Sequence, residues 1–322
     1  MIPMTVHPSR GGFLRTAGIS LSLGSLALLG LLTTGCSGGS GSAAVSPTIR
    51  TITRFTTIDG PGGGGTTING ISSNGAVVGF TTSNGVNANF LRSVNGAFTA
   101  VNVGDPAAGM VNGVNSGGML VGVANNSAFT LANGTQTKLT PPGSASSIAF
   151  GLNESGAIVG QFVSGNTTPG FLDVNGTFTT INPTPNAMVT NVQGINNKGQ
   201  AIGFYSTDGV HQHGFLYNIA TQQVTLLPDP NTPRIVSGGL VLTQFLGIND
   251  NNEAVGYYQT NNGSQFGFLF NLATQTYTFL DAPQAAPVNS VQITQITGVT
   301  NTGEICGFFI DAQGVQHGFI AQ

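Results

Sequence analysis

The stretch "GINNKGQAIGFY", Gly194 to Tyr205, joins two apolar runs through a short polar turn and ends in aromatic residues. Asn, Ser and Gly in such turns tolerate the positive φ of a tight hairpin, so the stretch predicts two antiparallel strands. The pattern returns along the chain roughly every 40 to 50 residues, and a period of this size indicates a repeat fold. The six copies begin at Gly70, Gly113, Gly151, Gly194, Gly247 and Gly298.

Each copy carries two further apolar segments after this hairpin. A step such as "GFL", at Gly170 and Gly214, follows first, and an element such as "NGTFTTIN" at Asn175 follows that step. Four short strands in a unit of this length are typical of a β-propeller blade, and a linear β-solenoid is the competing architecture.

The ends of the repeat region discriminate between the two architectures. "RFTTID", Arg54 to Asp59, matches "TFTTIN", Thr177 to Asn182, which is the fourth strand of another unit, whereas the sixth copy stops at Gln322 after its third strand. A ring needs this arrangement to complete its last blade, and a solenoid gains nothing from it. We therefore expect an all-β, six-bladed β-propeller over residues 49–322, closed by an N-terminal strand. The second copy has degenerate third and fourth elements, so whether it forms a full blade stays open.

A second glycine recurs inside the strand pattern of every copy, directly after an apolar pair. Glycine within a strand indicates a close approach of two backbones or a β-bulge. These glycines are Gly79, Gly122, Gly160, Gly203, Gly256 and Gly307. In the fifth copy Asn252 replaces the glycine of the hairpin turn, and Asn is the other residue that adopts positive φ at low cost.

The composition excludes some classes of function. Only 6% of the residues are Asp, Glu, Lys or Arg, against about 25% in an ordinary soluble domain. Beyond residue 35 the chain has 8 − 2 = 6 basic and 11 acidic side chains, because Arg10 and Arg15 precede that point. A weakly acidic surface of this kind excludes nucleic-acid binding through a basic patch, and the scarcity of charge argues against long exposed helices.

The N-terminal segment differs from the rest of the chain. Residues 1–35 contain an apolar run and end in "LLTTG" before Cys36, which is similar to a bacterial lipoprotein signal peptide whose cysteine becomes lipidated. "SRGGFLR", from Ser9, also resembles a twin-arginine signal, but Gly11 replaces the second arginine, which favours the general secretory route. A transmembrane helix is the other alternative, although the apolar run is short and interrupted by glycine.

The next segment, residues 36–48, is the candidate lipidated cysteine followed by a Gly/Ser-rich flexible linker. Ser37, directly after the cysteine, resembles an outer-membrane sorting signal. We therefore expect an exported protein that the lipid alone anchors to the cell envelope, at the outer membrane or the cell surface. With Cys36 lipidated, Cys306 has no partner for an intrachain disulfide.

The units resemble the extracellular repeats of the HAF family, whose pattern is roughly "GINxxGxxVGxYxxxxGxxHGFLxxxGxxTxLDxPG". The likeness covers residues 50–322 and is clearest in "GVHQHGFLY", from Gly209, and in "GVQHGFI", from Gly314. The second copy departs most from the pattern, with "SAFT" in place of "HGFL". The resemblance implies an exported repeat protein, and it implies no activity or catalytic residues.

The histidines and the cysteine of the repeats are weak candidates for chemistry. His211 and His213 lie two residues apart, hence on one face of a predicted strand, and His317 aligns with His213. They are the only metal candidates, and no Cys or carboxylate cluster completes a ligand set, so we expect no metal and no cofactor. Cys306 aligns with valines and isoleucines in the other copies, which indicates a small buried core residue.

No carboxylate stands out as catalytic. Asp59 and Asp281 share a repeat position with asparagines at the exit of a fourth strand, where Asp and Asn commonly begin a turn. Asp250 and Glu253 belong to a predicted hairpin turn. Because the chain also lacks a nucleophile elbow and a phosphate loop, we assign no catalytic residue.

Two connections between repeats are longer than the others, and both fall at the same point of the unit. They comprise residues 228–245 and 281–293, and Asp229, Arg234 and Asp281 give them charge on a nearly uncharged surface. Insertions on one face are where repeat folds commonly place binding. We therefore expect a non-catalytic binding or scaffold module with a carbohydrate or protein partner in the envelope. The alternative is an envelope hydrolase or lyase, which requires a close pair of carboxylates in the central channel.

Overall fold

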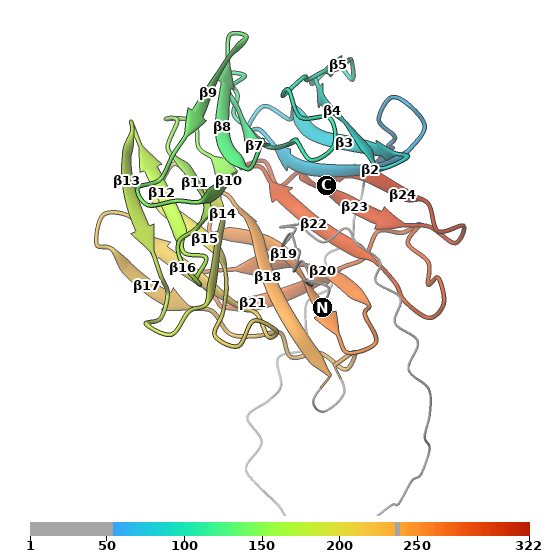
Figure 1. The fold of residues 1–322 in the computed structure, drawn as a ribbon. Coiled ribbons are helices and arrows are strands. Elements are labelled where there is room, and N and C mark those ends of the chain that lie inside the picture. The colour runs from blue at the N-terminus through green and yellow to red at the C-terminus, as the bar shows by residue number, and fades with distance from the viewer. Residues whose placement is uncertain (1–53, 236–238) are drawn as a thin grey trace, which may run out of the picture. The chain divides into compact units, whose positions relative to one another are not determined.

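The computed structural model describes residues 54–235 and 239–322, in which 24 strands form six four-stranded antiparallel sheets (Figure 1). We number the sheets as blades 1 to 6. Blade 1 comprises β2 (Gly65–Ile71), β3 (Val77–Ser83), β4 (Val86–Arg92) and β5 (Phe98–Ala100); blade 2 comprises β6 (Met110–Val114), β7 (Leu120–Ala124), β8 (Ser127–Ala132) and β9 (Thr135–Leu139); and blade 3 comprises β10 (Ser146–Leu152), β11 (Ile158–Val163), β12 (Gly170–Val174) and β13 (Thr177–Ile181). The second repeat therefore forms a complete blade.

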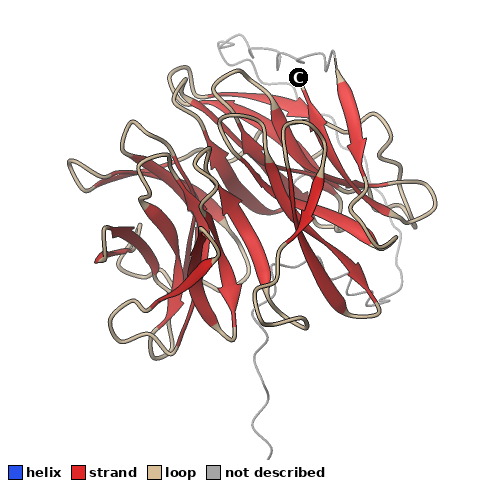
Figure 2. Cartoon of the chain, turned by 90° about the horizontal axis from the view of Figure 1, so that it is seen from above, coloured by secondary structure: helices blue, strands red, loops and turns tan. Residues whose placement is uncertain are grey.

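The remaining blades follow the same order of strands. Blade 4 comprises β14 (Val189–Ile195), β15 (Gln200–Ser206), β16 (His213–Asn218) and β17 (Gln223–Leu226); blade 5 comprises β18 (Leu240–Ile248), β19 (Glu253–Thr260), β20 (Gln265–Asn271) and β21 (Thr276–Leu280); and blade 6 comprises β22 (Thr294–Val299), β23 (Ile305–Ile310), β24 (Gln316–Ala321) and β1 (Phe55–Ile58). Figure 2 shows strands and loops but no helix among the described residues.

The blades are arranged around a common axis. The first strand of every blade contacts the first strands of both neighbouring blades, in the cycle β2, β6, β10, β14, β18, β22 and back to β2. The first strands are therefore innermost, and the fourth strands form the outer edge. This is the six-bladed β-propeller that the repeats predict, with successive strands of a blade paired as a meander.

The N-terminal strand completes the last blade. β1 pairs antiparallel with β24, with Phe55 opposite Ala321 and Ile58 opposite Gly318. Blades 6 and 1 are also joined directly, because Thr297 Oγ1 donates a hydrogen bond of 2.9 Å to the carbonyl oxygen of Ile68. The sequence match of "RFTTID" with the fourth strand of other repeats correctly identified this role.

Both recurring glycines are required where two backbones approach each other. A Cβ on Gly203 would overlap the carbonyl oxygen of Asn191 on the adjacent strand, and the other five second-strand glycines have the same relationship. The first glycine of each repeat lies at a β-bulge close to the next blade, and a Cβ on Gly194 would lie 3.1 Å from Cα of Gly247. Asn252 takes the turn position with φ of 62°, as its substitution for glycine predicts.

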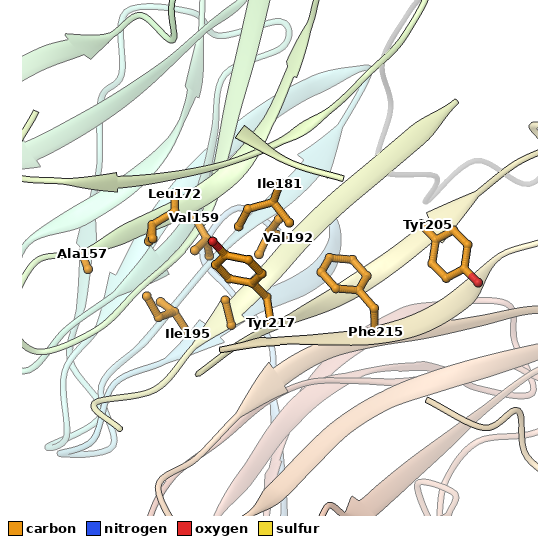
Figure 3. Packing of buried hydrophobic residues seen from close by; sticks show 10 residues of the cluster. Ala157, Val159, Leu172, Ile181, Val192, Ile195, Tyr205, Phe215 and Tyr217 are labelled. Carbon is orange, nitrogen blue, oxygen red and sulfur yellow. The ribbon is translucent and has the colours of Figure 1, made fainter. Parts of the chain in front are cut away.

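The hydrophobic core is divided among the interfaces between blades. In one cluster, shown in Figure 3, Val159 and Leu172 of blade 3 pack against Val192, Phe215 and Tyr217 of blade 4. Cys306 is fully buried in the equivalent layer between blades 6 and 1. Burial raises the pKa of its thiol to about 12, so the cysteine is a core residue, as the repeat alignment predicts.

Strand direction gives the ring two distinct faces. One face carries the links from each fourth strand to the first strand of the next blade, together with the turns between second and third strands. We call it the connection face. The turn face is the opposite one. Arg54 lies on the turn face, where its backbone N–H donates a hydrogen bond of 3.1 Å to the carbonyl oxygen of Gln322. The chain therefore enters the propeller on the turn face.

The predicted signal peptide, Cys36 and the Gly/Ser linker lie outside the described residues. Over the parts of the chain that the structure describes, no helix has the length and apolar character needed to cross a membrane.

Candidate binding face

The two long connections lie together on the connection face and are joined by an ion pair. In the first, residues 227–235 and 239 are described, and the second comprises residues 281–293. Arg234 NH2 lies 2.7 Å from Asp281 Oδ2, and the guanidinium of Arg234 lies over the ring of Phe266, 4.5 Å from its centroid. Partial burial lowers the pKa of Arg234, but the hydrogen bond with Asp281 outweighs it and the pKa is raised. The guanidinium of Arg234 therefore stays charged.

The bounds predicted for the first long connection need correction. Residues 240–245 belong to β18, which is nine residues long and has register irregularities at Leu240/Leu242 and Phe245/Gly247. Part of the extra sequence therefore lengthens a strand instead of a loop. The second connection has the predicted bounds, since β21 ends at Leu280 and β22 begins at Thr294.

Asp229 holds the first long connection against blades 4 and 5. Its Oδ2 lies 2.8 Å from Nδ1 of His213, and its Oδ1 accepts a hydrogen bond of 2.8 Å from Thr243 Oγ1. Next to it, Tyr277 donates a hydrogen bond of 2.6 Å from its hydroxyl to the carbonyl oxygen of Pro228. Both oxygens of Asp229 therefore have partners within the protein, and the residue fixes the connection in place.

In three successive blades, an imidazole or guanidinium side chain contacts a carboxylate at the same place. His213 pairs with Asp229 in blade 4, and His317 pairs with Asp59 in blade 6, at 2.7 Å. In blade 5 Phe266 stands where blades 4 and 6 have histidine, and Arg234 from the preceding connection contacts Asp281 instead. The sequence placed these residues at repeat positions but did not predict that they pair. The repeat pattern could have predicted these contacts. In each blade the start of the third strand lies beside the end of the fourth strand, so residues at these two repeat positions are neighbours.

His317 also contacts a second carboxylate. Its Nε2 lies 3.1 Å from Asp311 Oδ2, and its ring stacks on Phe309. Partial burial lowers the pKa of His317, but the hydrogen bonds with Asp59 and Asp311 outweigh this and raise it. A backbone hydrogen bond from Val315 and the contact with His317 lower the pKa of Asp311. An imidazole held between two carboxylates is thus favoured in its charged form.

The sequence suggested that His211 and His213 share one face of a strand, and this prediction is wrong. β16 begins at His213, and His211 lies in the preceding turn with Nδ1 2.7 Å from Asp208 Oδ2. The two rings therefore contact different carboxylates. Within residues 54–235 and 239–322, no group of three or more His, Cys, Asp or Glu side chains is arranged to hold a metal ion.

The turn face carries a ring of polar side chains, one from each blade. They occupy the same repeat position and are Ser73, Ser116, Glu154, Asn197, Asp250 and Asn301. Glu154 accepts hydrogen bonds from the hydroxyls of Ser73 and Ser116, and Asp250 accepts them from the amides of Asn197 and Asn301. The sequence placed Asp250 in a hairpin turn, but it did not predict these contacts between blades.

Both carboxylates of this ring have lowered pKa values. Partial burial raises the pKa of Glu154, but hydrogen bonds from Ser116 and Ser73 outweigh it. For Asp250, the hydrogen bonds from Asn197 and Asn301 likewise outweigh partial burial. Both groups are therefore ionised at neutral pH, whereas acid–base cleavage of a glycosidic bond needs one carboxyl group with a raised pKa.

The side chains that border the axis contain no charged group. One repeat position of the first strand, three residues before the first glycine, lies directly opposite a residue of the second strand in every blade. These pairs are Thr67–Phe80, Met110–Val123, Ile148–Gln161, Asn191–Phe204, Gln244–Tyr257 and Gln295–Phe308. Five apolar residues from blades 1 to 3 pack as one cluster here, which places these positions near the axis. Blades 4, 5, 6 and 1 instead pair a polar side chain with an aromatic ring.

Neither a family model nor a curated protein matches the sequence. Solved structures of similar fold include TolB of Acinetobacter baumannii, at TM-score 0.47 and 11% identity over 66% of this chain and 53% of that chain. Virginiamycin B lyase of Staphylococcus aureus has a TM-score of 0.45 and 13% identity over 84% of this chain and 99% of that chain. A lectin of Aleuria aurantia has a TM-score of 0.49 and 11% identity over 80% and 91%. The chain thus spans about half the length of TolB.

Proposed function

We propose that this protein is an exported, lipid-anchored propeller that binds a partner in the cell envelope through its connection face, without catalysis. The observation that carries the proposal is the ion pair between Arg234 and Asp281, which joins the two longest connections of the ring. Asp229 fixes the first of these connections with two further contacts. Connections held in this way form a preorganised surface, and preorganisation lowers the entropic cost of binding.

The direction of the first described strand supports this choice of face. The chain enters the propeller on the turn face, through Arg54. A tether from Cys36 would cross residues 37–53, a reach of at most roughly 60 Å when fully extended. Such a tether would join the propeller at the turn face and leave the connection face without an attachment.

The charge distribution favours binding over hydrolysis or elimination. Hydrolysis or lyase chemistry by paired carboxylates would place acidic groups at the axis, and the positions that border it are neutral. Glu154 and Asp250 lie in turns of the opposite face and have lowered pKa values. Neither is suited to act as the general acid that such a mechanism needs.

Photocrosslinking in cells tests the proposal. We would place a photoreactive amino acid at Asn231, which is exposed on the connection face, and at Thr274, which is exposed on the turn face. The full exported chain should give a discrete adduct from Asn231 and little from Thr274. Equal adducts from both positions, or no adduct from Asn231, would contradict binding through the connection face.

Replacing Cys36 with Ser should release the chain from the membrane fraction, and its retention there would contradict the lipid anchor.

A further inference from the structure

The polar side chains that border the axis alternate with aromatic rings over four neighbouring blades. Asn191 lies opposite Phe204 in blade 4, Gln244 opposite Tyr257 in blade 5 and Gln295 opposite Phe308 in blade 6. Thr67 opposite Phe80 continues the pattern in blade 1. Residues directly opposite each other share one face of a sheet, so each polar group lies beside a ring. We call these eight residues the amide arc.

A second row of glutamines joins the amide arc to the connection face. Gln244 donates a hydrogen bond of 2.6 Å to Gln212 Oε1, and Gln295 donates one of 2.6 Å to Gln265 Oε1. The third contact has the opposite direction, because Gln316 donates a hydrogen bond of 2.6 Å to Thr67 Oγ1. Gln212, Gln265 and Gln316 occupy the same position at the start of three third strands, and all three are half-buried. The row therefore lies at the connection-face end of the ring, in the links between second and third strands.

These amides retain hydrogen-bonding capacity after their mutual contacts. A glutamine side chain has two N–H donors and an oxygen that accepts two hydrogen bonds. Gln212 accepts one hydrogen bond through Oε1 from Gln244, and Gln316 donates through Nε2 to Thr67 and to the carbonyl oxygen of Thr66. The remaining donors and acceptors are fixed in orientation by the bonds already made. An ordered set of this kind suits a ligand that both donates and accepts.

One buried acceptor beside the arc has no partner in the protein. Gln161 takes the second-strand position in blade 3, where blades 4, 5, 6 and 1 have aromatic rings, and it is 7% exposed. Its Oε1 receives no hydrogen bond from the described residues. A buried acceptor without a donor costs free energy, and a hydroxyl delivered to this position would remove that cost.

We propose that the amide arc and the glutamine row bind a neutral carbohydrate chain at the mouth of the ring; this rests on the proposed binding function and names its ligand class. Sugar hydroxyls both donate and accept hydrogen bonds, as amides do. The axis positions have no cation for a uronate or a phosphate, and Arg234 is already paired with Asp281. An acidic glycan would therefore lose hydration without gaining a countercharge.

Calorimetric titration with defined oligosaccharides tests the ligand class. The exported chain, in mild detergent, would be titrated with maltohexaose, cellohexaose and chitohexaose, and with hexagalacturonate as the acidic comparison. We expect at least one neutral hexasaccharide to bind, with Kd between about 10 μM and 1 mM, and hexagalacturonate to bind more weakly. Binding by none of the three neutral sugars, or tighter binding of hexagalacturonate, would overturn the proposal.

Two substitutions locate the site within the ring. Gln244→Met with Gln295→Met keeps the length of both side chains and removes two amides of the arc, and it should weaken binding about tenfold for each hydrogen bond lost. Gln223→Met on the exposed outer strand β17 is the matched control and should leave the affinity unchanged. Unchanged affinity in the double variant, with its melting temperature preserved, would overturn the proposed location. A crosslinked adduct from Asn231 without any sugar binding would refute the carbohydrate class and leave the proposed function standing.

Discussion

Arg234 forms an ion pair of 2.7 Å with Asp281, and the two residues belong to different connections of the ring. The pair replaces the histidine–aspartate contact found within blades 4 and 6, because Phe266 occupies the histidine position in blade 5. Arginine from one connection thus stabilises the carboxylate of the next. The consequence is that the connection face is held together between blades as well as within them.

Removing Arg234 should have a moderate effect on stability. The side chain of Arg234 is 44% exposed, so solvent screens the pair, and Arg234→Met should lower the free energy of unfolding by about 1 kcal/mol. Urea-induced unfolding followed by circular dichroism measures this change. Lys138→Met, at an exposed lysine of β9, is the control and should change little. If Arg234→Met lowers the free energy of unfolding no more than the control does, the ion pair does not stabilise the connection face.

His317 should make stability depend on pH. Its pKa is raised in the folded protein, so its contribution is fully present below the unfolded pKa and is lost as the pH rises through the folded pKa. The pKa of Asp311 is lowered, so its contribution is lost as the pH falls through that pKa. His317→Gln should therefore destabilise the protein most near pH 6 and least near pH 9. Denaturant-induced unfolding of both proteins at these two pH values measures the difference. A destabilisation that does not fall between pH 6 and pH 9 would contradict the pairing.

A side chain at the recurring second-strand glycine should be poorly tolerated. Gly203→Ala places a Cβ against the carbonyl oxygen of Asn191 and should destabilise the protein by about 3 kcal/mol. Gly117→Ala is the matched control, because its Cβ would lie 3.4 Å from Asn115 Oδ1, an ordinary contact. Thermal unfolding measures both variants. Equal melting temperatures would refute the close approach of β14 and β15.

Cys306 should be unreactive in the native protein. Its thiol is fully buried and its pKa is raised to about 12, so the thiolate is scarce at neutral pH. In a Cys36→Ser background, a maleimide reagent at pH 7.5 should label Cys306 only after the protein is unfolded in urea. Rapid labelling of the folded protein would place this cysteine outside the core.

The sequence predicted the ring better than the site, for a physical reason. Glycines at Gly79 and its equivalents, and the match of "RFTTID" to a fourth strand, reflect constraints that every blade shares, so repetition reveals them. The contact of Ser73 with Glu154 joins residues 81 positions apart in different blades, and no repeat predicts it. The charge of Asp229, Arg234 and Asp281 identified these residues in the sequence. Their partners could not be predicted for the same reason, because they depend on how blades 4, 5 and 6 meet.

The most direct measurement tests whether the N-terminal strand completes blade 6, because both faces and the position of the tether depend on it. Thr56 lies directly opposite Ile320 in the register of β1 and β24, and opposite residues of antiparallel strands have Cα atoms close enough for a disulfide. In a chain with Cys36→Ser and Cys306→Ala, the pair Thr56→Cys and Ile320→Cys should form a disulfide under mild oxidation and raise the urea midpoint of unfolding. Two thiols that remain free and reactive in the folded chain would contradict the closed ring.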